Sequence, residues 1–330
     1  MIKEKNQKIQ VLRGIAIIAV VLTHTCFNTE MQIFVRPFVN FAVALFLFLS
    51  GYLTNTDTTN WKAFYKKRII RILIPYTFWT IFYTTNTFHI GGFDFKKYII
   101  NFFTAGASEP LYYVFMYIEL ILLTPLLVKL AKSKYKWTGF LITPVWVIAN
   151  YFYIFGAQHS AVINQLQLII GIGGFVFYYL GLLVGNDLIK KKFDIRILVA
   201  IYVISILIQT LEGFLWYRAG IGDPGTQMKL SSVLTSCIAL LIASWYLKNE
   251  KEHKGTLSKI IKNVFAKIGD YSLGIYFFHT MVIMSLGWLP WFVALPYGVN
   301  SIIVFVLSFI CVFIASVILR KRISRWLGLC

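Results

Sequence analysis

From Tyr271 to Leu319 the chain reads YSLGIYFFHTMVIMSLGWLPWFVALPYGVNSIIVFVLSFICVFIASVIL, without one Asp, Glu, Lys or Arg. About 20 apolar residues are enough for an α-helix to cross a bilayer. This stretch is long enough for two such helices, divided at 287–298, where Gly and Pro residues interrupt it. The stretch therefore indicates a helical integral membrane protein.

The same pattern recurs along the 330 residues. Further charge-free stretches cover 14–29, 37–56, 72–93, 137–186, 197–211 and 230–247, and two more apolar stretches carry one acid each, Glu119 and Glu212. We predict an all-α polytopic bundle of about ten transmembrane helices, which forms a single transmembrane domain over 1–330 with no separate soluble domain. The predicted spans are 12–27, 34–54, 69–88, 111–129, 138–155, 165–185, 197–216, 230–247, 268–287 and 299–319.

Composition and charge support this class. Charged residues make up 14% of the chain, against about 25% in soluble domains, which argues against a soluble enzyme. Lys and Arg outnumber Asp and Glu by 32 to 13. With the N-terminus inside, 27 of the 32 basic residues fall in inner segments, as expected for cytoplasmic loops. Both termini are therefore predicted to be cytoplasmic, and the net charge is explained without a nucleic-acid partner.

Three arginines and one imidazole stand out, because charge within a membrane is costly. Arg13 and His24 are eleven positions apart, which places them on one helix face about 16 Å apart. Arg68 and Arg71, at i and i+3, open the third predicted span at the same inner rim. Guanidinium groups bind phosphate through paired hydrogen bonds, and an imidazole exchanges protons near neutral pH. Coenzyme A, with phosphates at one end and a thioester on a long arm, fits this spacing.

The alternative is that these arginines only mark the inner rim and that His24 is a core histidine. Two further residues carry the same ambiguity. His279 lies about 18 Å beyond Lys267 along its helix, at a depth similar to that of His24, and either lines the same cavity or makes a structural hydrogen bond. Glu119, near mid-membrane, orients an imidazole or relays a proton, or it is a protonated packing residue. The cysteines, with no paired spacing, indicate neither a disulfide framework nor a metal site; they are Cys26, Cys237, Cys311 and Cys330.

Four segments, in order, resemble motifs of the acyltransferase-3 family of integral membrane acyltransferases. They are Leu12-Arg13-Gly14-Ile15-Ala16 with His24, the run from Phe46 to Leu53 that contains Ser50-Gly51, Arg68-Ile69-Ile70-Arg71, and Ser272-Leu273-Gly274-Ile275-Tyr276-Phe277-Phe278-His279. One segment departs from the pattern. The family usually has Leu-Trp-Phe-Leu before the fourth helix, where this chain has Leu111-Tyr112-Tyr113-Val114.

The resemblance implies transfer of an acyl group, commonly acetyl from acetyl-CoA, to a hydroxyl of an extracytoplasmic carbohydrate at the cell membrane. It implies that Arg13, His24, Arg68 and Arg71 are required. Our hypothesis is that the arginines bind the CoA phosphates. His24 then either deprotonates the acceptor hydroxyl or briefly accepts the acyl group. His279 and Glu119 are further catalytic candidates. The expected partners are the lipid bilayer, acyl-CoA as cosubstrate and a carbohydrate acceptor, with no metal.

A second class of function is a polysaccharide exporter or flippase without acyl transfer, since ten helices and a basic inner rim also suit it. A path for saccharide cargo should be polar through its middle. In this chain the mid-membrane charge reduces to Glu119, with Glu212 and the two histidines nearer the outside. A third possibility is an acyltransferase of the membrane-bound O-acyl type. It would share the reaction, but it lacks the pairing of Arg and His in the first helix.

Overall fold

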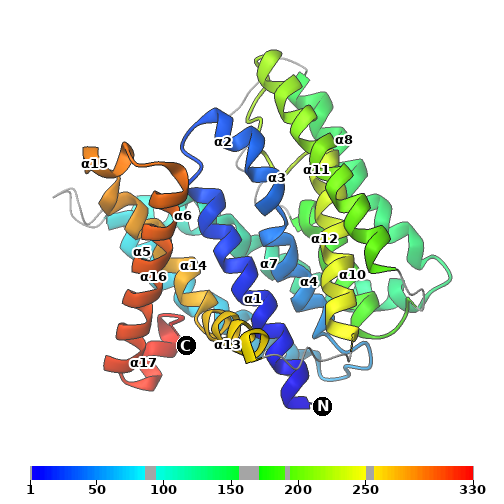
Figure 1. The fold of residues 1–330 in the computed structure, drawn as a ribbon. Coiled ribbons are helices and arrows are strands. Elements are labelled where there is room, and N and C mark those ends of the chain that lie inside the picture. Colours follow the sequence, from blue (N-terminus) through cyan, green and yellow to red (C-terminus); the bar gives the residue numbers. More distant parts are fainter. Residues whose placement is uncertain (1, 86–93, 156–170, 190–193, 250–255, 330) are drawn as a thin grey trace.

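The computed structural model describes residues 2–85, 94–155, 171–189, 194–249 and 256–329, and every regular element in these ranges is helical (Figure 1). The elements are α1 (Ile2–His24), α2 (Thr29–Phe34), α3 (Arg36–Val39), α4 (Phe41–Tyr52), α5 (Trp61–Thr85), α6 (Phe95–Thr104), η1 (Glu109–Leu111), α7 (Tyr112–Lys132), η2 (Lys136–Leu141), α8 (Ile142–Phe155), η3 (Gly171–Gly174), α10 (Phe175–Gly185), α11 (Ile195–Arg218), α12 (Leu230–Lys248), α13 (Thr256–Asp270), α14 (Ser272–Leu286), α15 (Pro290–Val293), α16 (Tyr297–Ile318) and α17 (Lys321–Trp326).

Five segments of the described chain are long and apolar enough to cross a membrane: Gln7–His24, Glu109–Lys132, Ile195–Arg218, Leu230–Lys248 and Tyr297–Ile318. Three shorter apolar helical segments are Arg36–Tyr52, Gly171–Gly185 and Ser272–Leu286. The helical, membrane-spanning class is therefore confirmed, whereas the count of ten spans and the cytoplasmic termini stay predictions. Parts of two predicted spans, 86–88 and 165–170, lie outside the described residues, as does Cys330.

Helix α1 passes through the middle of the bundle and contacts α4, α13, α14 and α16 (Figure 1). Its crossing with α13 depends on two glycines. A Cβ atom added at Gly14 would lie 2.1 Å from the carbonyl oxygen of Phe265, and one added at Gly269 would lie 1.9 Å from that of Gln10. Helix backbones approach this closely in membranes where small residues line the contact. The glycine that follows Arg13 is therefore explained by packing.

A second close crossing joins α4 to α10. A Cβ atom at Gly51 would lie 2.0 Å from the carbonyl oxygen of Tyr178, and one at Gly181 would lie 2.0 Å from that of Phe48. Gly185 meets the backbone of Tyr52 in the same way. The Ser-Gly pair at the end of α4 thus supplies a glycine to this crossing and leaves Ser50 for other contacts.

Three helices that carry basic residues lie wholly or mostly in segments that the charge-free pattern left as loops. Helices α6 and α13 are amphipathic, with basic residues placed along an otherwise apolar sequence, and α17 is a short basic helix that follows α16. Helix α17 and the N-terminal part of α1 lie at the same end of the bundle, whereas α2 and α15 lie at the other (Figure 1). Asp94, as N-cap of α6, accepts a hydrogen bond from the backbone N–H of Lys97 at 3.0 Å, which stabilises the helix start.

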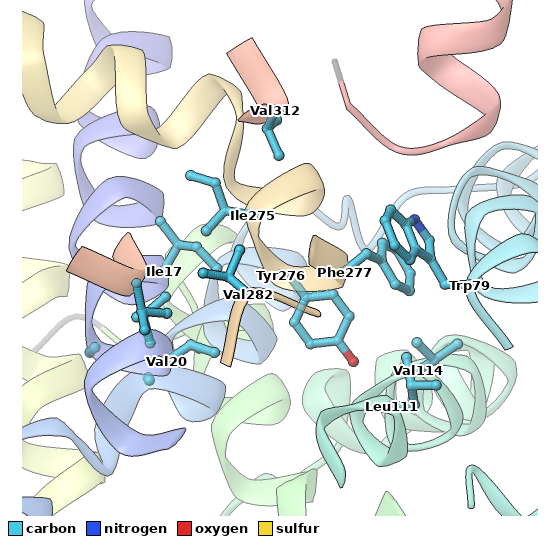
Figure 2. Close-up of a cluster of buried hydrophobic side chains, with 14 of the residues drawn as sticks. Ile17, Val20, Trp79, Leu111, Val114, Ile275, Tyr276, Phe277, Val282 and Val312 are labelled. Carbon is cyan, nitrogen blue, oxygen red and sulfur yellow. The ribbon is translucent and has the colours of Figure 1, made fainter. Parts of the chain in front are cut away.

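The largest apolar cluster fills the space between α1, α5, α7, α14 and α16. Ile17 and Val20 of α1 pack there with Ile275 and Tyr276 of α14 (Figure 2). Phe277 lies with its ring parallel to that of Trp79, with a centroid separation of 6.3 Å. Burial of these side chains stabilises the contact of α14 with α1, and it sets the relative positions of the two histidines described next.

Candidate active site

Two imidazoles from distant parts of the chain meet at one end of the apolar cluster. His24 is the last residue of α1 and His279 lies at the middle of α14. Their ring centroids are 5.3 Å apart, with an angle of 45° between the ring planes. His279 is fully buried, whereas 15% of the His24 side chain is exposed. The accessible imidazole is therefore His24, with His279 behind it.

The contacts of His279 fix which of its nitrogens is free. Its Nδ1 lies 3.0 Å from the carbonyl oxygen of Ile275, one turn earlier in α14. A carbonyl oxygen only accepts hydrogen bonds, so Nδ1 carries the hydrogen and the neutral ring keeps a lone pair on Nε2. That Nε2 is buried and has no hydrogen-bond partner within the described chain. A buried acceptor without a partner is costly, and this lone pair is available to a proton or to a hydrogen-bond donor.

A carboxylate that was not predicted from the sequence lies beside these two imidazoles. The Oε2 atom of Glu109 lies 3.8 Å from Nδ1 of His24. This separation is too long for a hydrogen bond but short enough for a direct charge interaction. The Glu109 side chain is 72% exposed, so solvent screens the interaction. The structure thus assembles two imidazoles and a carboxylate at the outer predicted end of α1.

Three hydrogen bonds hold these groups in place. The Tyr276 hydroxyl donates to the carbonyl oxygen of Pro110 at 2.6 Å, which fastens the turn η1 to α14. The Tyr297 hydroxyl donates to the carbonyl oxygen of Leu22 at 3.0 Å. The Thr25 and Ser301 hydroxyls lie 2.7 Å apart. Because the last carbonyls of a helix lack partners within it, contacts from α16 fix the end of α1 where His24 lies.

At the other end of the same helix face, Arg13 lies near a second arginine. Its Nη1 is 3.4 Å from Oε1 of Gln10, and it is close enough to Arg71, Tyr113 and Tyr117 to interact with them electrostatically. Arg71 is exposed and makes no hydrogen bond or ion pair with the described residues. Two neighbouring guanidinium groups with free donors suit a phosphate. Tyr113, from the segment that departs from the family pattern, lies between this arginine and α14, with its ring 5.7 Å from that of Tyr276.

Arg68 has a different environment from Arg71. Its Nη1 donates to the hydroxyl and the carbonyl oxygen of Ser50, at 2.9 and 3.1 Å, and its Nη2 donates to the carbonyl oxygen of Leu53 at 3.0 Å. Its guanidinium carbon also lies 4.8 Å from the centroid of the Phe64 ring. Arg68 therefore binds the C-terminal end of α4, where helix carbonyls attract cations.

The family assignment follows from the comparison with known proteins. A family model described as an acyltransferase domain matches residues 6–321. The chain belongs to the acyltransferase-3 family. No curated protein and no solved structure matches it. Membership supports membrane acyltransferase activity.

In this acyltransferase, the four motifs have different structural roles. The first motif and the Ser-Gly pair each supply a glycine to a close helix crossing. The Arg-x-x-Arg motif supplies one arginine to the end of α4 and leaves the other exposed. The last motif supplies Tyr276, which holds η1, and His279, which contacts His24.

Glu119 of the acyltransferase lies in α7, ten residues beyond Glu109, and accepts a hydrogen bond from the backbone N–H of Gly171. Its contact with η3 gives it a structural task, and its catalytic role stays a prediction. Glu212 likewise accepts hydrogen bonds from the hydroxyls of Tyr151 and Ser231, between α8, α11 and α12. Within the described ranges, no group of three or more His, Cys, Asp or Glu side chains is placed to hold a metal ion.

Proposed function

We propose that the protein transfers an acyl group, acetyl in the simplest case, from acyl-CoA on the cytoplasmic side to a hydroxyl of an extracytoplasmic or lipid-linked carbohydrate. Membership of the acyltransferase-3 family supports the reaction class. The observation that carries the assignment of the site is the contact between His24 and His279 beside Glu109. An imidazole that is accessible on one side and held on the other is suited to general base catalysis.

In the proposed reaction, His24 takes the proton of the acceptor hydroxyl while the hydroxyl oxygen attacks the thioester carbonyl carbon. The C–S bond then breaks, the new ester leaves, and the CoA thiolate recovers the proton from the imidazolium. In the alternative, a ring nitrogen of His24 attacks the thioester carbonyl carbon, the C–S bond breaks and the CoA thiolate leaves. The acceptor hydroxyl then attacks the acyl-histidine, its proton passes to the lone pair of His279, and the ester leaves as the bond to His24 breaks. Glu109 stabilises the imidazolium by its charge in the first route.

In this proposal, three arginines bind the phosphates of CoA: Arg13, Arg71 and Arg68. Arg13 and Arg71 hold the phosphates, and Arg68 is shared between the phosphates and the end of α4. The acyl arm then has to pass Ile17 and Val20, which are buried on the α1 face between Arg13 and His24. The proposal therefore requires these side chains to move when acyl-CoA binds.

The direct test uses purified protein in lipid nanodiscs, radiolabelled acetyl-CoA and a glycan fraction from cells that lack the protein. We expect label in the glycan, and its loss with His24→Ala at an unchanged thermal unfolding midpoint. Phe27→Ala, an exposed position at the same end of α1, is the control and should keep activity. Normal labelling with His24→Ala would refute the role of His24.

Two outcomes would separate this proposal from the exporter. Movement of a lipid-linked saccharide between leaflets without acyl transfer would favour the exporter. Loss of one ester substituent from the surface glycans of cells without the protein would identify the acceptor and the acyl group together.

A further inference from the structure

A basic groove lies between α5 and α17, away from the imidazole pair. Its volume is about 1060 Å³, at the upper end of the range for small-molecule sites. Among the described residues that line it, none is acidic and five are basic: Lys66, Lys67, Arg71, Arg322 and Arg325. Such a concentration of one sign of charge favours an anionic ligand.

The same groove has an apolar wall. Ile70 and Ile74, one turn apart on α5, line it together with Leu273 of α14. Both isoleucines are about two-fifths exposed, and Phe78 and Ile81 continue the exposed stripe along α5. From Ile70 to Ile81 the stripe extends about 16 Å. The basic residues lie at the start of α5 and the stripe leads away from them, so the surface is polar at one end and apolar along its length.

The wall formed by α17 is an integral part of the fold. Trp79 of α5 donates from Nε1 to the carbonyl oxygen of Leu327 at 3.1 Å. Gly328 turns the chain with a φ of 72°, and its Cα faces Pro75 of α5. Trp326, half-exposed beside the groove, stacks with Arg322, whose guanidinium carbon lies 4.9 Å from the ring centroid. A tryptophan beside basic residues is typical of the membrane interface.

We propose that this groove binds one anionic phospholipid of the cytoplasmic leaflet. The phosphate lies among Lys66, Lys67, Arg322 and Arg325, and one acyl chain lies along the stripe from Ile70 to Ile81. Basic pockets between membrane helices on the cytoplasmic side bind anionic lipid head groups in this way. The apolar stripe favours a lipid over a soluble nucleotide, because a nucleotide has no chain to cover it. The proposal does not depend on the acyl-transfer reaction.

The test measures lipid retention by native mass spectrometry of protein exchanged into mixtures of phosphatidylglycerol and phosphatidylcholine. We expect one bound phosphatidylglycerol in preference to phosphatidylcholine. Arg322→Gln with Arg325→Gln should weaken retention roughly ten- to thirty-fold, at about 1 kcal/mol for each charge. The matched control is Arg320→Gln with Lys321→Gln, which removes the same charge from residues that do not line the groove, and it should retain the lipid.

Each of the other results would overturn the proposal. Equal loss in both double variants would show that only general surface charge matters. Equal retention of the two lipids would show that the groove has no preference for an anionic head group. Arg71 lines the groove and is also assigned to the CoA phosphates in the proposed function, so competition by CoA is measured with Arg71→Gln protein. Displacement of the bound lipid by free CoA from that variant would show that the remaining basic residues form a nucleotide site instead. If the α17 variant fails to fold, Lys66→Gln with Lys67→Gln tests the same phosphate position from α5.

Discussion

Replacement of Gly14 by alanine tests whether the glycine after Arg13 sets the relative position of His24 and His279, the two histidines of the candidate site. The added Cβ would lie 2.1 Å from the carbonyl oxygen of Phe265, a backbone atom that cannot rotate away. To reach even 3.0 Å, below which real Cβ contacts essentially do not occur, α1 and α13 must separate by about 0.9 Å. Overpacking of this kind costs about 1–3 kcal/mol.

Two effects of the substitution oppose each other, and their magnitudes decide the sign. Alanine favours a helix over glycine by about 1 kcal/mol, whereas a clash with backbone belongs at the upper end of the overpacking cost. We therefore expect a net loss of about 2 kcal/mol of stability. Helix α13 leads directly into α14, which carries His279, so the separation also moves the two imidazoles. A displacement of about 1 Å in an active site can lower the rate about 100-fold.

The assay compares the thermal unfolding midpoint and the acetyl-transfer rate of Gly14→Ala in nanodiscs with those of wild type. Gly298→Ala is the matched control, because no atom lies within 4 Å of a Cβ atom added there. The control should keep both values or gain slightly in stability. Gly14→Ala protein with a wild-type midpoint and a rate within two-fold of wild type would refute the reasoning.

Two further predictions concern charge. Glu109→Gln keeps the shape of the side chain but removes the negative charge beside His24. The acyl-transfer rate should therefore fall about ten-fold, which is within the range of an acid–base contribution. The control is Glu30→Gln, which changes an exposed acid at the same end of the protein and should leave the rate unchanged. A rate equal to wild type in Glu109→Gln would exclude the carboxylate from the reaction. Arg68→Ala should lower stability by about 1–3 kcal/mol, because it removes hydrogen bonds from a charged donor, whereas Arg71→Ala should weaken CoA binding with little change in the unfolding midpoint. Unchanged CoA affinity in both arginine variants, measured by calorimetry, would remove the phosphate role.

The sequence predicted helices well where they are apolar and poorly where they are amphipathic. Charge-free stretches identify apolar spans because the membrane excludes charge. The same criterion misses α13, where Lys259, Lys262 and Lys267 recur among apolar residues. Basic residues at this spacing mark one face of a helix rather than a loop. A search for helical periodicity within the basic segments would have found α13.

The contact between the two histidines could not be predicted from helix rise. Counting rise from Lys267 to His279 assumes one continuous helix, whereas α13 ends at Asp270 and α14 begins at Ser272. The meeting of the two rings depends instead on how α1 and α14 pack together. Glu109 was not predicted because only acids inside the predicted spans were taken as candidates. The sequence feature that indicates Glu109 is its position directly before the predicted span 111–129, at the outer end where His24 also lies. Arg68 and Arg71 share a helix face, so the sequence does not distinguish them. Only the three-dimensional position of Ser50 shows that Arg68 is hydrogen-bonded within the protein while Arg71 is exposed.

The buried layer between Arg13 and His24 also has a consequence for the electrical tightness of the membrane. Ile17, Val20 and Ile275 interpose hydrocarbon between the arginine level and the imidazole level. Narrow hydrophobic constrictions exclude water and ions. In a membrane, a layer of packed apolar side chains at this level of α1 would oppose the passage of water and protons between the two ends of the helix.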